Sequence, residues 1–212
     1  MGILKSGLHG PVRNKTGPSV TRVHRNINVV TAAYRKSNNP PTTEQMEIQR
    51  KFGLLSSFLS HIDDLIKTGF KHYSKGKDPV NVAYSYNYNH AFVINETGIV
   101  LNYPALKYSR GYIAESESPG LLALPEQIEF SWLPQRQSNY CQYTDLATFL
   151  VCNPIKETVM KQVAVTDRYE QGYLLNTPKS WAGDVVHCYM NFSSKDRKLQ
   201  GNSSYVGEIL CI

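Results

Sequence analysis

Apolar residues between Thr42 and Gly69 recur every three or four positions, which is the spacing of one face of an α-helix. Thr42 and Gln45 have the spacing of a capping box, and Gly69 is a typical C-terminal stop. The pattern therefore predicts one long amphipathic helix, whose wide apolar face needs more than one neighbour to cover it. The face comprises two adjoining stripes: Ile48, Phe52, Leu55, Leu59, Ile62 and Ile66, with Leu54, Phe58 and Leu65 beside them.

The opposite face of this helix carries mostly small side chains, among them Gly53, Ser57 and Ser60. Small residues let a second backbone approach closely, so these three positions are candidates for a protein–protein interaction. An ordinary solvated helix face is the alternative interpretation.

Before the helix, β-branched and polar residues alternate in three short segments separated by turn signals. The expected strands are Val12–Thr16, Ser19–His24 and Asn26–Ala33. A ribbon with so few large apolar residues has little core of its own, so it must lie against another element, domain or subunit. We therefore expect residues 1–38 to form an arm.

After the helix, residues 79–95 fit two periodicities. Their tyrosines and valines alternate as in a strand, but Val80, Tyr84 and Tyr88 also repeat as in a helix. Asp78 followed by proline is a helix start, which favours the helix. Two short strands, Ile99–Tyr103 and Leu106–Ser109, are expected next.

From Tyr112 onwards, short apolar segments alternate with turn residues, and this spacing predicts a β-sandwich. The seven expected strands are Tyr112–Glu115, Gln127–Trp132, Leu146–Asn153, Lys161–Thr166, Gly172–Leu175, Val185–Phe192 and Tyr205–Ile212.

Three segments of this region, Ile128–Pro134, Leu174–Pro178 and Val186–Phe192, resemble the second, fifth and sixth strands of a fibronectin type III-like domain. The resemblance implies an immunoglobulin/fibronectin III-like β-sandwich at residues 111–212. Residues 1–110 are then the N-terminal region, a basic β-ribbon arm followed by the long amphipathic helix. The expected fold class is α+β.

Further blocks are spread along the whole chain: Met1–Lys5, Val12–Gly17, Arg35–Ser37, Pro40–Thr42 with Gln45, Gly69–Lys71, Ser109–Gly111, Trp181–Asp184 and Val186–His187. Together they resemble an uncharacterised bacterial family of similar length, a family that has no assigned activity. The basic, glycine-containing start followed by N-P-x-T and a helix is also similar to segments of bacteriophage structural proteins. These resemblances imply a structural or virion component.

Positive charge is concentrated before the helix. Up to Thr43 the chain has no acidic residue, so the net charge of +6 arises from this segment. Its cations suit contacts with phosphates, which would make binding strongly salt-dependent, although Tyr34 is the only aromatic residue there for base stacking. An assembly arm and a solvated face are the other interpretations. The candidate nucleic-acid contacts are Lys5, Arg13, Lys15, Arg22, Arg25, Arg35 and Lys36.

Catalytic and metal-binding signatures are missing from the sequence. The four cysteines contain no C-x-x-C pair, so we expect free thiols, with Cys152 and Cys188 as the first pair to test for a disulfide. No phosphate-binding loop, nucleophile elbow or zinc-protease motif occurs, and we expect no catalytic residues, no cofactor and no metal. The chain also lacks a long apolar run and a signal peptide, which predicts cytoplasmic synthesis without a membrane span.

The sequence thus predicts a non-enzymatic structural protein. It would self-associate, or dock on a larger particle such as a virion or filament, through its arm and helix. The alternative is a nucleic-acid-binding protein that uses the basic arm. No small-molecule substrate is expected.

Overall fold

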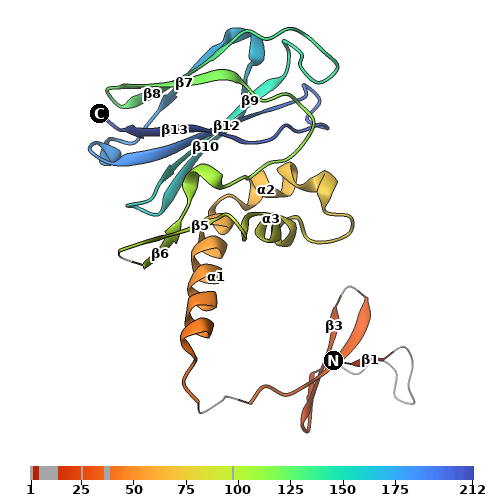
Figure 1. The fold of residues 1–212 in the computed structure, drawn as a ribbon. Helices are drawn as coiled ribbons and strands as arrows, with labels where there is room; N and C mark the ends of the chain where they lie inside the picture. The colour runs from red at the N-terminus through yellow and green to blue at the C-terminus, as the bar shows by residue number, and fades with distance from the viewer. Residues whose placement is uncertain (1, 5–13, 25, 36–38, 97) are drawn as a thin grey trace. The chain divides into compact units, whose positions relative to one another are not determined.

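The computed structural model describes residues 2–4, 14–24, 26–35, 39–96 and 98–212 (Figure 1). The chain divides into two compact units, Met1–Gln45 and Met46–Ile212. The expected fold class is wrong: strands account for 42% of the residues and helices for 24%, the helices are short, and the strands form several small sheets.

The first unit contains a four-stranded antiparallel sheet with the order β1-β4-β3-β2. Its strands are β1 (Gly2–Leu4), β2 (Asn14–Thr16), β3 (Ser19–His24) and β4 (Ile27–Ala32). The tight turns around Gly17 and Asn26 both use left-handed backbone, at φ +56° and +62°, which these residue types tolerate best. Of the side chains described in this sheet, Thr21 and Val29 are buried, so the sheet has very little core.

The predicted single long helix is two helices, α1 (Thr43–His61) and α2 (Asp63–Gly69). At Ile62 the backbone leaves the helical region, with φ −121° and ψ 24°. Lys161 stabilises the break, because its Nζ contacts the carbonyl oxygen of His61 at 3.2 Å and the Asp64 carboxylate at 2.7 Å. Thr42 and Gln45 do form the predicted capping box.

Residues 79–95 begin as a helix and end as a strand. In α3 (Pro79–Asn87) the Asp78 side chain accepts a hydrogen bond from the Val80 backbone N–H at 2.8 Å. β5 (Phe92–Asn95) then pairs with β6 (Gly98–Leu101). The strand expected at Leu106–Ser109 does not form. Two short 3₁₀ helices flank these elements, η1 (Lys71–Tyr73) and η2 (Tyr103–Ala105).

The remaining strands form two sheets, with the orders β11-β8-β7 and β10-β9-β12-β13. The expected strand at Tyr112–Glu115 is reduced to one bridge, from Ile113 to Gly201. The element bounds are β7 (Glu117–Leu124), β8 (Gln127–Leu133), β9 (Leu146–Asn153), β10 (Thr158–Asp167), η3 (Arg168–Glu170), β11 (Gly172–Asn176), η4 (Lys179–Trp181), β12 (Val185–Ser193) and β13 (Ser204–Leu210).

Strand β9 is buried on both faces and joins two cores. Phe149 and Val151 pack between the two sheets, whereas Leu150 and Cys152 pack against the helices. The helices therefore share a core with the sheet, and the compact unit begins at Met46. The domain boundary expected after Arg110 stays a prediction.

All four cysteines are buried free thiols. Cys152 and Cys188 lie on neighbouring strands, but their side chains belong to the cores on opposite faces of the sheet. This placement gives them no route to a disulfide. Within the described chain, no helix combines the length and the apolar character needed to cross a bilayer.

Candidate functional site

The basic residues predicted to contact nucleic acid are only partly described. Lys5, Arg13, Arg25 and Lys36 lie outside the described residues. Lys15 pairs with Val20 and Arg22 with Val29, and Val20 and Arg22 are two residues apart on β3. Lys15 and Arg22 therefore share one face of the sheet, where both side chains are exposed. Arg35 is also exposed, beyond the end of β4.

The three small residues predicted to form one interaction site are divided between two surfaces of α1. Gly53 and Ser57 line a groove between α1 and the strands that follow it. Ser60 lines a different depression, between α1 and α3. Helical periodicity identified the positions, but it contained no information about what each one faces.

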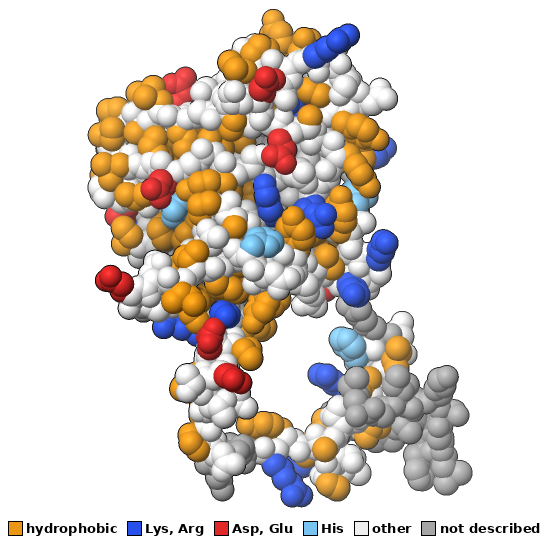
Figure 2. Space-filling model, in the orientation of Figure 1, with side chains coloured by type: hydrophobic (Ala, Val, Ile, Leu, Met, Phe, Trp, Pro, Cys, Tyr) orange, Lys and Arg blue, Asp and Glu red, His pale blue; other side chains and the backbone are white. Residues whose placement is uncertain are grey.

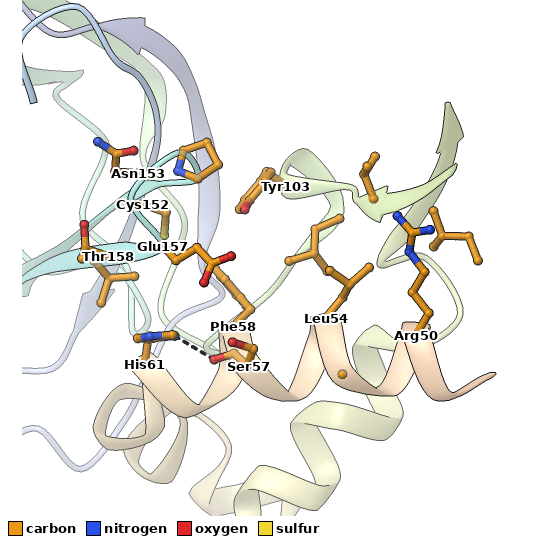
Figure 3. A pocket seen from close by; sticks show the side chains of 16 residues that line it. Arg50, Leu54, Ser57, Phe58, His61, Tyr103, Cys152, Asn153, Glu157 and Thr158 are labelled. Carbon is orange, nitrogen blue, oxygen red and sulfur yellow. Dashed lines mark hydrogen bonds between the residues drawn. The ribbon is translucent and has the colours of Figure 1, made fainter. Parts of the chain in front are cut away.

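The first of these surfaces, which we call the helix groove, has a volume of about 410 Å³. It follows α1 from Arg50 to His61 and is closed on the other side by β6, by Tyr103 and by the β9–β10 turn (Figure 3). The apolar part of its lining includes Leu54, Phe58, Ile99, Leu101, Pro154 and Val159.

Two contacts fix the position of Tyr103 in the wall of the helix groove. The ring of Tyr103 stacks on His187 with 4.1 Å between the ring centroids, and the Tyr189 hydroxyl donates a hydrogen bond to the Tyr103 carbonyl at 2.8 Å. Burial raises the pKa of Tyr103 to about 12, and it also raises the pKa of the nearby Cys152 thiol. Both groups stay protonated at neutral pH, so neither contributes a charge to the groove.

Charge enters the helix groove from Arg50 and Glu157. The Arg50 guanidinium lies against the start of β6, since a methyl group on Gly98 would be 2.8 Å from its Nη1 atom. Glu157 comes from the β9–β10 turn, and its side chain points toward Phe58 and Ser57 (Figure 3). In the described part of the chain, neither Arg50 nor Glu157 forms a salt bridge. Sequence reasoning singled out neither residue.

A third surface, which we call the aromatic face, shares Phe52 and Tyr84 with the Ser60 depression. It is formed by Ile48 and Phe52 of α1, Tyr84 of α3 and Tyr88, which follows the last residue of α3. Its rings form a ladder, with centroid distances of 5.3 Å from Phe52 to Tyr84 and 5.7 Å from Tyr84 to Tyr88. Ile48 is 56% exposed and Phe52 is 58% exposed. In Figure 2, hydrophobic side chains are visible among the charged ones on the side of the molecule where α1 lies.

No group of three His, Cys, Asp or Glu side chains suited to a metal ion occurs among the described residues. Comparison with curated proteins gives no match to this chain. The profile of the family of unknown function DUF6266 matches residues 10–207, so the chain belongs to that family.

Proposed function

We propose that this is a non-enzymatic assembly protein, in which the N-terminal sheet of one copy docks on the aromatic face of another. The observation that carries the proposal is the uneven burial of one apolar stripe of α1. Leu55 and Leu59 are 0% and 1% exposed, whereas Ile48 and Phe52 on the same stripe are more than half exposed. An exposed apolar patch continuous with a core is typical of a protein–protein interface.

The N-terminal sheet has the complementary property. It buries almost nothing among its described residues, and it leaves Val23 and Ile27 of its hairpin 40% and 46% exposed. A sheet needs a buried apolar face to be stable. A second copy of the chain supplies such a surface at the aromatic face. A phage particle or filament of bacterial origin is one setting for this assembly, supported by the sequence resemblance alone.

Light scattering coupled to size-exclusion chromatography tests the proposal on the full chain. We expect the mass to exceed that of a monomer and to increase with concentration. Phe52→Ser should lower the mass toward the monomer because it removes the centre of the aromatic face. Leu174→Ser is the matched control, since Leu174 is 50% exposed on β11. A monomer at every concentration, or equal effects of the two variants, would refute the proposal.

A second candidate function is nucleic-acid binding by the arm, favoured by the shared face of Lys15 and Arg22. Two phosphate contacts contribute about 1.8 to the slope of log affinity against log salt concentration, at about 0.9 for each contact with duplex DNA. In mobility-shift titrations at several salt concentrations, the slope for the Lys15→Gln/Arg22→Gln double variant should be smaller than the wild-type slope by this amount. If the wild-type chain shifts no DNA at low salt, this candidate fails.

A further inference from the structure

The helix groove has the size and lining of a ligand site. Its volume of about 410 Å³ lies within the range of small-molecule pockets, which are mostly apolar with a few polar groups that fix orientation. The groove extends over three turns of α1, from Arg50 to His61, which is about 16 Å at 1.5 Å per residue. Its shape therefore suits a linear molecule that lies along the helix.

Gly53 leaves the middle of the groove empty. A methyl group built on Gly53 would meet no atom within 4 Å, so no neighbouring atom requires glycine here. A glycine inside a helix costs about 1 kcal/mol relative to alanine. The apolar lining of the groove includes Leu54, Phe58 and Leu101, which suit an unbranched hydrocarbon segment.

The two charges of the groove come from different elements and have opposite signs. Arg50 lies at the end next to β6, and Glu157 lies near Ser57 and Phe58, closer to the other end (Figure 3). Neither has an ion-pair partner among the described residues. A guanidinium binds a carboxylate through paired N–H donors, and a carboxylate binds an ammonium group. Most of the remaining lining is apolar.

From this arrangement we infer that the helix groove binds a linear zwitterion, with a carboxylate for Arg50, an amine for Glu157 and an apolar chain between them. The Tyr103 wall and the Cys152 thiol contact the apolar chain of the ligand. The groove and the aromatic face have no lining residue in common. This inference therefore does not depend on the proposed assembly.

Isothermal titration calorimetry of the full chain with 8-aminooctanoate, octanoate and octylamine tests this inference. We expect 8-aminooctanoate to bind at least tenfold more tightly than either singly charged probe. Arg50→Gln should weaken 8-aminooctanoate and octanoate but not octylamine. Glu157→Gln should weaken 8-aminooctanoate and octylamine but not octanoate.

Gly53→Leu supplies the steric test, because its side chain fills the empty middle of the groove and should abolish binding of all three probes. Gly53→Ala is its matched control and should retain binding, and thermal unfolding verifies that both variants fold. The inference is overturned if no probe binds, if octanoate binds as tightly as 8-aminooctanoate, or if Gly53→Leu binds like the wild type.

Discussion

Replacing Gly53 with alanine should stabilise the protein, whereas the same replacement at Gly69 should destabilise it. Both glycines are helical, in α1 and α2, and both changes add one methyl group. At Gly53 the new methyl group meets nothing within 4 Å. At Gly69 it would lie 2.6 Å from the Tyr108 carbonyl oxygen and 2.7 Å from the Ser109 Cα atom. The surroundings of each glycine therefore decide whether the added methyl group increases or decreases the free energy of unfolding.

The expected magnitudes follow from these contacts. At Gly53 only the helix propensity changes, which increases the free energy of unfolding by about 1 kcal/mol. At Gly69 the atoms in the way belong mainly to the backbone, so the segment that contains Tyr108 must shift, at a cost of about 1–3 kcal/mol. That shift also strains the hydrogen bond from the Arg110 N–H to the Gly69 carbonyl, now 3.1 Å.

Thermal unfolding followed by circular dichroism measures both effects. In a protein of this size 1 kcal/mol changes the melting temperature by about 2–4 °C. Gly53→Ala should therefore melt about 2–4 °C higher than the wild type, and Gly69→Ala should melt lower by at least that amount. The reasoning is refuted if Gly69→Ala is as stable as Gly53→Ala, since the close backbone approach at α2 would then carry no cost.

Three further predictions concern buried and charged groups. Arg168→Met should lower the free energy of unfolding, measured in urea, by about 3–5 kcal/mol. Arg168 and Asp145 are both 2% exposed, with 3.5 Å between Nε and Oδ2, and the variant leaves the buried Asp145 carboxylate without its cation. All four cysteines are at most 3% exposed, so a thiol reagent should label them only after denaturation, and rapid labelling of the folded chain would contradict the fold. The hydrogen bond from Lys156 lowers the pKa of Asp184 below its ordinary 3.8. This pair therefore stabilises the fold above pH 3.8, and the stabilisation is lost as the pH falls through the lowered pKa. The melting temperature of Asp184→Asn should fall less on acidification than that of the wild type.

The strands could be predicted wherever apolar alternation was uninterrupted. β9 has the predicted bounds, Leu146–Asn153, because every residue before Asn153 is apolar or small and turn residues flank the strand. β7 was missed because Pro119 and Gly120 signal a turn in its middle. In the structure this is a bulge, with a register shift between Glu117 and Gly120 and left-handed backbone at Ser118. A bulge and a turn use the same residue types.

The break between α1 and α2 could not be predicted from periodicity. Leu59, Ile62 and Ile66 are all buried, so the apolar stripe continues across the break without interruption. The contacts that stabilise the break come from Lys161, about a hundred residues later in the chain. Local spacing contains no information about such a partner, and a continuous helix was therefore the simplest interpretation.

Only the α1 side of the helix groove could be predicted from the sequence. Arg50, Gly53, Ser57 and His61 follow one another at intervals of three and four residues, so they share one side of α1. The opposite wall comes from β6 and from the β9–β10 turn, whose positions depend on how β9 packs against the helices. The charge of Glu157 in this wall became meaningful only after folding brought it to the same groove as Arg50.

The helix groove and the aromatic face lie on different sides of α1, so this helix contributes residues to both surfaces. Its C-terminal part is fixed in the core by Leu55, Phe58 and Leu59, while Ile48 and Phe52 remain exposed. A ligand along the groove would contact Gly53 and Leu54, and a partner on the aromatic face would contact Ile48 and Phe52. The two binding events would use adjacent residues of one helix, so any coupling between them would be reciprocal.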